Sequence, residues 1–332
     1  MKPGVLVSPR PARACLAVSL LTWLLVFGAY WTQPDSLAFV TAWPAWAWGI
    51  VGLLFVLAGW RRPRRAALAL CALWLVWTAA IAEEPRALLR PRSRPSAKWQ
   101  EAVNRGAAFR VVSLNCVGGN AAAAAEVVGY KPDIVLLQES PGKREVERLA
   151  HRLFGHAHGI AYGIDTSVIS RWPARSIALP RNLRTYCVWA RVRLPCGKQI
   201  DCLSVRLAPP VFRLDAWRPA CWRAYAANRR ERRMQARAVA RCLGRRSEPM
   251  PLVVGGDMNA PGGDAALREF GPLLRDAFGE AGHGLCNTVL NDCPVLRFDQ
   301  VWVSHRLDAC VLSARKTRHS DHRLVACDIV VN

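Results

Sequence analysis

One stretch guides the interpretation of the whole chain: Val253-Val254-Gly255-Gly256-Asp257-Met258-Asn259-Ala260-Pro261. Apolar residues followed by glycines predict a short buried strand that ends at polar residues. Side chains two residues apart on an extended segment point to the same side, so Asp257 and Asn259 are expected to face one pocket. A carboxylate that orients water, beside a neutral donor, suits hydrolysis of a phosphate ester. Because Gly-Asp-x-Asn is also an ordinary turn, this interpretation depends on partners elsewhere in the chain.

Polar side chains also stand at the ends of other predicted strands, at Asn115, Glu139, Asp299, Asp321 and His322. A carboxylate such as that of Glu139 suits a hard divalent cation, and amide or imidazole donors can stabilise charge on phosphoryl oxygens. A histidine benefits from a carboxylate that fixes its tautomer, and Asp299 is suited to do this for His322. These residues are therefore expected to meet in one site.

From residue 108 onward, short apolar runs alternate with turns and amphipathic segments. Helices are expected at residues 121–130, 143–154 and 228–243. Strands are expected at residues 109–115, 134–137, 166–170, 188–193, 200–207, 300–303 and 323–331. Because several neighbouring strands have no helix between them, the pattern favours a layered α/β or α+β domain with mixed sheets over a doubly wound parallel one.

The order of these motifs resembles the endonuclease/exonuclease/phosphatase superfamily. The resemblance rests on Ser113-Leu114-Asn115, Pro132-Asp133-Ile134-Val135-Leu136-Leu137-Gln138-Glu139, Gly256-Asp257-Met258-Asn259, Phe298-Asp299-Gln300-Val301 and Ser320-Asp321-His322. It spans about residues 108–332, and the apolar N-terminal part is similar to that of a membrane-anchored bacterial subgroup. The resemblance implies a four-layered α/β sandwich with two central mixed β-sheets, preceded by transmembrane α-helices.

The resemblance also implies a divalent-metal cofactor, Mg²⁺ or Mn²⁺, in the cleft. Glu139 would ligate the metal, Asn115 would support the metal or the phosphate, and Asp321 would lie in the outer metal shell. Carboxylate and amide oxygens suit such hard cations. For Asn115 there is an alternative, because an asparagine at a strand end often satisfies local backbone groups instead.

The same resemblance places catalytic groups around the phosphate. Asp257 would position the attacking water, and Asn259 would bind a phosphate oxygen. His322 would act in acid/base chemistry or phosphate stabilisation, with Asp299 orienting it. Together these roles describe in-line attack at phosphorus by a water that the metal and Asp257 organise.

One position departs from the family pattern. The family commonly has a histidine in the middle strand, where this chain has Ser204-Val205-Arg206-Leu207-Ala208-Pro209. Arginine does not exchange a proton near neutral pH, but it binds phosphate well. Arg206 is therefore expected to bind phosphate without transferring protons, and the alternative is a weakened site. The arginines of residues 229–233 are expected to form a solvated helix face.

Residues 1–82 contain three apolar runs, at about residues 14–31, 36–60 and 66–82. Each approaches the roughly 17–25 residues that a helix needs to cross a bilayer, and tryptophans stand near the ends of the runs. We expect a membrane anchor of about three transmembrane helices over residues 1–82, a Pro/Arg-rich linker over 83–104 and a catalytic domain over 105–332. The alternative is a soluble domain with buried helices.

Charges in the loops predict the orientation in the membrane. Basic residues precede the first run and fill residues 61–65, whereas the first connection carries no Lys or Arg. The positive-inside rule then places the catalytic domain on the extracytoplasmic side, although residues 86–98 are also basic. Of the 12 cysteines, Cys15 and Cys71 lie in apolar runs; an oxidising compartment would permit disulfides among the other ten, and Cys286 with Cys293 is the easiest pair to imagine.

The formal net charge of +22 would attract polyanions such as nucleic acid or phospholipid headgroups, although an arginine-rich solvated surface also explains it. The expected function is a membrane-tethered, metal-dependent phosphoester hydrolase, more readily a phosphodiesterase of nuclease or phospholipid-headgroup type than a phosphomonoesterase. The alternative, motivated by Arg206, is a non-catalytic membrane-anchored binding protein that retains the fold. The loops between Pro209 and Ala227, rich in Trp, Arg and Pro, are expected to shape specificity.

Overall fold

The computed structural model describes residues 9–60, 63–90, 97–245 and 250–332. Residues 61–62, part of the basic loop used to predict orientation, lie outside the described residues. The chain forms two compact units. The first comprises residues 1–86 and 213–226, and the second comprises residues 87–212 and 227–332.

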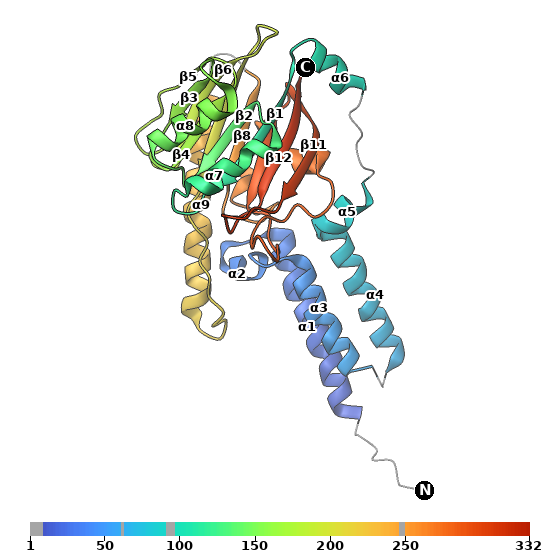
Figure 1. The fold of residues 1–332 in the computed structure, drawn as a ribbon. Helices are drawn as coiled ribbons and strands as arrows, with labels where there is room; N and C mark the ends of the chain where they lie inside the picture. The colour runs from blue at the N-terminus through green and yellow to red at the C-terminus, as the bar shows by residue number, and fades with distance from the viewer. Residues whose placement is uncertain (1–8, 61–62, 91–96, 246–249) are drawn as a thin grey trace. The chain divides into compact units, whose positions relative to one another are not determined.

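Two six-stranded mixed β-sheets form the centre of the second unit (Figure 1). The first sheet has the order β11 (Leu307–Arg315), β12 (Leu324–Val331), β1 (Ala108–Asn115), β2 (Ile134–Gln138), β4 (Thr166–Ser170) and β3 (Gly159–Tyr162). The second has the order β5 (Ala174–Ser176), β6 (Cys187–Arg193), β7 (Gln199–Arg206), β8 (Leu252–Asp257), β10 (Asp299–Ser304) and β9 (Leu274–Asp276). Among the neighbouring strands of these two sheets, in the described part of the chain, β1–β2 and β7–β8 are parallel and the other pairs are antiparallel.

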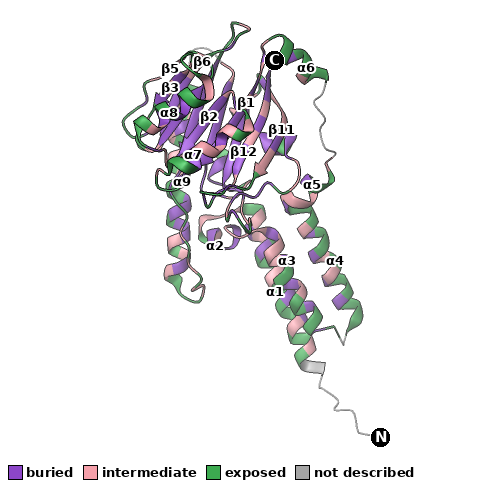
Figure 2. Ribbon diagram, viewed as in Figure 1, coloured by how far each residue is buried: buried purple, intermediate pink, exposed green. Residues whose placement is uncertain are grey.

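Apolar side chains from the two sheets form one buried cluster, to which Leu136 and Val168 of the first sheet and Val253 and Val301 of the second contribute. Helices of this unit include α7 (Ala121–Ala125), the 3-10 helix Glu126–Tyr130, α8 (Lys143–Phe154) and α10 (Ala277–Ala281). The helix α9 (Pro219–Gly244) belongs to this unit from residue 227 onward, and its residues 219–226 belong to the first unit. A second cluster joins α7 and α8 to the first sheet, and a third joins α9 to the second sheet. Buried strands lie between more exposed helices (Figure 2). The predicted four-layered α/β sandwich is confirmed.

The arginines of residues 229–233, in the middle of α9, do not all lie on a solvated face, so that expectation is wrong. Arg229 and Arg232 are buried, while Arg230 is exposed. The Arg229 guanidinium forms an ion pair with Asp264, whose side chain is also buried, at 3.0 Å. Burial lowers the pKa of Arg232, which donates to Asn228. Because buried charges need partners, these residues fasten α9 to the catalytic unit rather than solvate it.

The first unit is helical. Its elements are α1 (Pro9–Thr32), a 3-10 turn (Asp35–Leu37), α2 (Ala38–Thr41), α3 (Ala45–Ala58), α4 (Arg64–Ile81) and the start of α5 (Glu83–Leu89). Two of these helices, α1 and α4, are long and apolar enough to cross a membrane. The second expected run is a bent pair, Asp35–Thr41 and Ala45–Ala58, with an angle of 76° between its parts. Within residues 83–104, helices α5 and α6 (Ala97–Asn104) are present.

A buried polar chain holds the three long helices of the first unit together. The indole Nε1 of Trp74 donates to Ser19 Oγ at 3.0 Å, and that hydroxyl donates to the Gly52 carbonyl at 3.0 Å. Gly52 has no side chain, which leaves room for the Trp74 ring: an added Cβ would lie 1.9 Å from it. On the outside, large apolar side chains such as Leu21 and Val76 are exposed. These three groups are therefore hydrogen-bonded inside the bundle, while its outer surface carries exposed apolar side chains.

The suggested disulfide between Cys286 and Cys293 is not formed, and the described residues contain none. The Cys286 thiol instead donates to the His283 carbonyl at 3.4 Å. Cys202 and Cys327 are buried within strands and behave as small apolar residues.

Gly256 permits the strand that carries Asp257. Its φ is +144°, and an added Cβ would lie 1.9 Å from the Val205 carbonyl oxygen on the neighbouring strand. We expect Gly256→Ala to lower the free energy of unfolding by about 3 kcal/mol or more, because backbone must move and an unfavourable φ is imposed. Denaturant unfolding of the full chain in detergent measures this.

The matched control is Gly129→Ala, since an added Cβ there meets nothing within 4 Å. It should change the unfolding free energy by less than about 0.5 kcal/mol. Equal stability of the two variants would contradict this account of β8.

Candidate active site

The candidate residues gather at one edge of the two sheets. Asn115 ends β1, Glu139 follows β2, and Arg206 ends β7 directly opposite Asp257 at the end of β8. Asp299 begins β10 and lies opposite Asp257 in antiparallel register. The parallel pairs β1–β2 and β7–β8 each end at the same side, and β10, antiparallel to β8, begins where β8 ends. Residues far apart in sequence therefore meet at these strand ends.

A buried polar bridge joins the two sheets beside this edge. Gln138 Nε2 on β2 donates to Ser204 Oγ on β7 at 2.9 Å, and the Ser204 hydroxyl donates to the Leu137 carbonyl at 2.8 Å. All of these groups are buried, so each hydrogen bond removes a cost of desolvation. The bridge fixes the spacing of the strands that carry Glu139 and Arg206.

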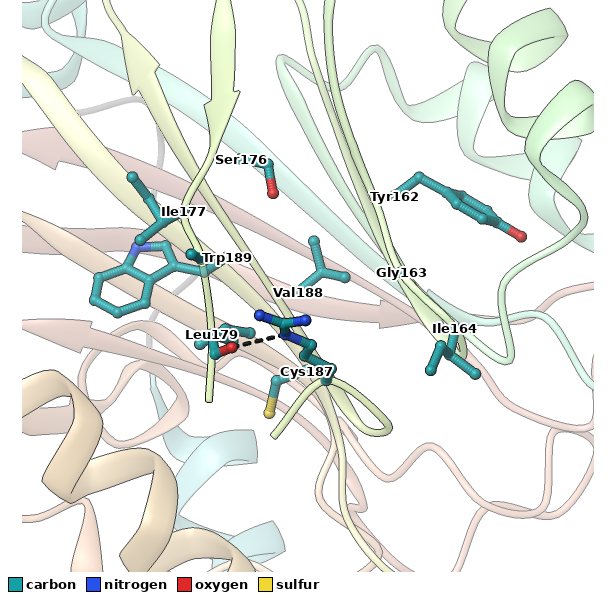
Figure 3. A pocket seen from close by; sticks show the side chains of 11 residues that line it. Tyr162, Gly163, Ile164, Ser176, Ile177, Leu179, Cys187, Val188 and Trp189 are labelled. Carbon is teal, nitrogen blue, oxygen red and sulfur yellow. Dashed lines mark hydrogen bonds between the residues drawn. The ribbon is translucent and has the colours of Figure 1, made fainter. Parts of the chain in front are cut away.

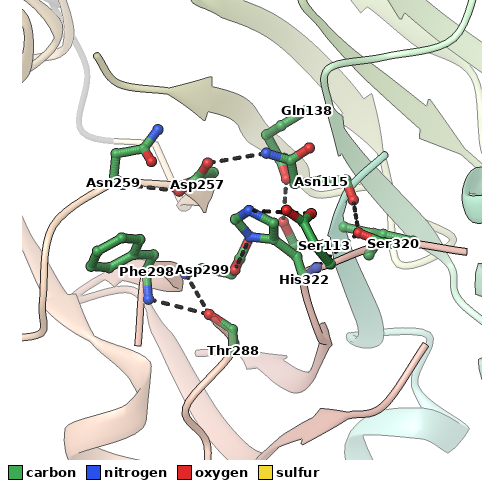
Figure 4. A network of polar contacts seen from close by, with 12 residues as sticks. Ser113, Asn115, Gln138, Asp257, Asn259, Thr288, Phe298, Asp299, Ser320 and His322 are labelled. Carbon is green, nitrogen blue, oxygen red and sulfur yellow. Dashed lines mark hydrogen bonds and ion pairs between the residues drawn. The ribbon is translucent and has the colours of Figure 1, made fainter. Parts of the chain in front are cut away.

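Asp257, Asp299 and His322 form the centre of the site (Figure 4). His322 Nδ1 and Asp299 Oδ2 are 2.7 Å apart, and one ligand atom from each of the three residues lies within 4.8 Å of the others. Asn115 Nδ2 donates to Asp257 Oδ2 and to Glu139 Oε1, each at 3.1 Å. One amide thus links Glu139 to the central cluster.

Burial and the Asp299 charge raise the pKa of Asp257 to about 6, against the lowering effects of His322, the Asn259 N–H and the Asn115 amide. For His322, burial would lower the pKa, but the charge and hydrogen bond of Asp299 outweigh it and raise the pKa to about 10. At neutral pH, Asp257 is thus ionised but close to its protonation range, and His322 is protonated. The site pairs a proton acceptor with a proton donor.

Glu139 is held as a carboxylate. Its burial favours the neutral form, but hydrogen bonds from the Gly118 N–H and the Asn115 amide, together with the Arg206 charge, lower its pKa. The Gly118 N–H···Oε2 distance is 2.6 Å. Glu139 also has a φ of +45°, which is unusual for a residue with a side chain and is common at functional sites.

Arg206 lies between two carboxylates. Its Nη2 donates to Glu139 Oε1 at 2.8 Å, and its Nη1 lies 3.4 Å from Asp165 Oδ2. Asp165 was not predicted, since the only sequence signal is an acid in a turn after Gly163. Burial raises the pKa of Asp165, and the Arg206 charge opposes this. The arginine that replaces the expected histidine is therefore oriented from two sides.

Asn259 and Asp321 are also near the cluster but differ in setting. The Asn259 N–H donates to Asp257 Oδ1 at 2.9 Å, and its Nδ2 donates to the Leu207 carbonyl at 2.8 Å. Asn259 therefore orients Asp257 and is tied to the segment after Arg206. The Asp321 side chain is 63% exposed, and its Oδ1 lies 3.9 Å from His322 Nε2. It is peripheral to the cluster.

The acidic cluster fits a divalent cation. Asp299 Oδ1 is buried and has no hydrogen-bond partner among the described atoms, and buried carboxylates face one another across β8 and β10. A cation would relieve both features. Glu139 and Asn115 offer oxygens nearby, but the Arg206 guanidinium already neutralises Glu139. The donor set thus accommodates a metal in competition with Arg206.

An open pocket of about 500 Å³ is lined by residues that neighbour Asp165 along the chain or pair with the strand that ends at Arg206 (Figure 3). Tyr162, Ile164, Val188 and Leu179 line it, and Ile164 directly precedes Asp165. Cys187, another lining residue, pairs with the strand residue before Arg206. The pocket is mainly apolar, and sequence reasoning did not predict it.

Two mixed sheets that share one edge of carboxylate, amide and imidazole groups define a phosphoesterase-type α/β sandwich. Residues 112–322 match the profile of the Endonuclease/Exonuclease/phosphatase family, so the chain belongs to this family. Family membership identifies the chain as a hydrolase of phosphoric ester bonds. No curated protein matches the sequence.

Solved structures show the same fold. The family protein from Bacteroides vulgatus has 14% identity and a TM-score of 0.54, covering 68% of this chain and 99% of that one. A family protein from Bacteroides thetaiotaomicron has 13% identity and a TM-score of 0.52, covering 68% and 95%. A humanized D. rerio TDP2 has 17% identity and a TM-score of 0.50, covering 67% and 99%. At these identities the likeness concerns fold alone.

The Arg206–Glu139 contact predicts how a metal binds. We expect Arg206→Ala to raise the Mn²⁺ affinity of the full chain about tenfold, because a cation that competes for the carboxylate is removed. Calorimetric titration with Mn²⁺ measures this. Arg171→Ala, which removes a half-exposed arginine paired with Asp133, is the control and should leave the affinity unchanged. An unchanged or weaker affinity in Arg206→Ala would show that the two cations do not compete.

Proposed function

We propose that the chain is a membrane-anchored, divalent-metal-dependent phosphodiesterase. The observation that supports this most is the buried cluster of Asp257, Asp299 and His322, which Asn115 links to Glu139. In this proposal residues 1–82 form the anchor, 83–104 the linker and 105–332 the catalytic domain.

Residues of this chain would carry out most of the reaction. A bound Mg²⁺ or Mn²⁺, held by Glu139 and Asn115 with Asp321 in its outer shell, would supply a positive charge for the phosphoryl oxygens. Asp257 accepts a proton from water as the water oxygen attacks phosphorus and the ester P–O bond breaks. His322 donates from Nε2 to a phosphoryl oxygen, since Asp299 holds its Nδ1 side.

Two further residues would bind the phosphate. The Arg206 guanidinium, held by Glu139 and Asp165, presents fixed donors that suit phosphate oxygens. The Asn259 amide has one N–H engaged with Leu207, and the other can reach a phosphate oxygen. Neither group transfers a proton.

The apolar pocket favours a diester over a monoester. A phosphodiester has a second ester group, and the pocket that includes Ile164, the residue before Asp165, offers about 500 Å³ of mainly apolar surface to hold it. A monoester would leave this surface unused. Nucleic acid and phospholipid headgroups are the two diester classes that the +22 charge suits.

The proposed anchor places the catalytic domain on the extracytoplasmic side of a multi-pass membrane protein. Support for the anchor comes from α1 and α4, which are long and apolar enough to span, and from their exposed apolar side chains. The bent pair of α2 and α3 would supply the third crossing that the extracytoplasmic side requires. We expect an impermeant amine reagent to label the exposed Lys198 in intact cells. If Lys198 is labelled only after the cells are lysed, the catalytic domain lies on the cytoplasmic side and the proposed orientation is wrong.

Asp257 should be essential for turnover. With bis(p-nitrophenyl) phosphate and Mg²⁺ or Mn²⁺, we expect Asp257→Asn to lower kcat about 100-fold or more, because water loses its proton acceptor. Asp292→Asn changes the same chemical group at an exposed position, where the carboxylate pairs with Lys316, and should keep wild-type activity. Wild-type protein that shows no metal-dependent turnover would favour the non-catalytic binding protein, and faster hydrolysis of p-nitrophenyl phosphate would favour a phosphomonoesterase.

A further inference from the structure

Residues 213–226 belong by contact to the helical first unit, although they lie in sequence within the catalytic domain. We infer that this segment, termed here the arm, binds the headgroup region of an anionic bilayer. The inference rests on the membrane anchoring proposed above and adds a second point of attachment. It gives a role to the Trp- and Arg-rich loop that sequence reasoning connected with specificity.

An aromatic cluster holds the arm in the first unit. The ring of Phe39 in α2 lies 5.1 Å from the Trp222 ring and 5.3 Å from the Tyr225 ring, measured between centroids. Phe39 and Tyr225 are buried. Contacts between aromatic rings of this kind add to the free energy of burial. The base of the arm is therefore packed on the short helix between α1 and α3.

Hydrogen bonds within the arm fix its shape. The Tyr225 hydroxyl donates to the Arg213 carbonyl at 3.1 Å, and Trp222 Nε1 donates to the Ala216 carbonyl at 2.7 Å. The Arg213 guanidinium pairs with Asp215 at 2.5 Å. With these groups satisfied inside the arm, the side chains that remain outside are available to a partner.

The outer side chains match the chemistry of a bilayer surface. Trp217 is 79% exposed and Leu214 is 63% exposed, and neither is sheltered by the packed base. Arg218 and Arg223 are exposed beside them. Tryptophan is enriched where lipid headgroups meet water, and each arginine near an anionic surface contributes about 1 kcal/mol. Apolar and cationic groups together favour an anionic phospholipid surface.

The connectivity of the helices agrees with this partner. If the bent pair of α2 with α3 and the helix α4 each cross the membrane, the start of that pair and the chain after α4 lie on the same side, whichever way the anchor is oriented. The arm packs on α2 and continues into the catalytic domain, so it lies on that side as well. The seven residue steps from Arg206 to Arg213 can span at most about 25 Å.

Photo-crosslinking tests the arm. The full chain, with p-benzoylphenylalanine in place of Trp217, is placed in nanodiscs that contain anionic phospholipid, irradiated and analysed by mass spectrometry for lipid adducts. The same residue in place of Leu21 of α1 tests the anchor, and in place of the exposed Lys198 it serves as a surface control. We expect adducts at positions 217 and 21 and at least tenfold less at 198.

The other outcomes separate the two proposals. An adduct at position 21 without one at 217 would overturn the arm but keep the anchor, and no adduct at 21 would overturn the anchoring itself. Equal adducts at 217 and 198 would mean unspecific contact and would also overturn the inference. Loss of the 217 adduct when single-stranded DNA is added would assign the arm to nucleic acid instead. Hydrogen–deuterium exchange tests the arm in the unmodified chain. We expect residues 213–218 to take up less deuterium in nanodiscs than in detergent.

Discussion

The opposition of Asp257 and Asp299 across β8 and β10 is the constraint on which the site depends. Antiparallel register places two buried carboxylates beside each other, and burial together with the Asp299 charge raises the pKa of Asp257. The arrangement is tolerable because His322 is protonated and hydrogen-bonded to Asp299, and because Asn115 donates to Asp257. The same repulsion gives the cluster its affinity for protons and cations. Position 256 accepts only a residue without a side chain, and the glycine there allows β8 to keep this register.

Arg206 gives this chain a site that differs from the expected one. A histidine at its position would titrate and leave Glu139 open to a metal, whereas arginine keeps its charge and neutralises that carboxylate. Asp165 holds the other side of the guanidinium, so the substitution is accommodated by a partner. The proposed enzyme would therefore bind metal and phosphate through one shared group, and its need for metal would depend on whether phosphate first draws Arg206 away from Glu139.

The sequence predicted which side chains gather here because they stand at the ends of strongly apolar strands, where Asn115, Glu139, Asp257 and Asp299 were recognisable. It did not predict Asp165, whose role depends on the pairing of β2 with β4, a contact between distant segments. Short edge strands such as β5 and β9 have three residues each and show no usable alternation. Burial of Arg229 was missed for a similar reason, since its partner Asp264 lies in a loop with no pattern of its own.

The hydrogen-bonded bridge from Gln138 through Ser204 to Leu137 has a further consequence for motion. Because it ties the two sheets together beside the site, neither sheet can separate locally without exposing unsatisfied buried groups. The amide protons of β2 and β7 should then exchange with solvent only through global opening. A cofactor or substrate that binds at this edge would stabilise the folded state and so slow amide hydrogen exchange in both sheets. Occupancy of the site would then also determine how often the whole domain opens.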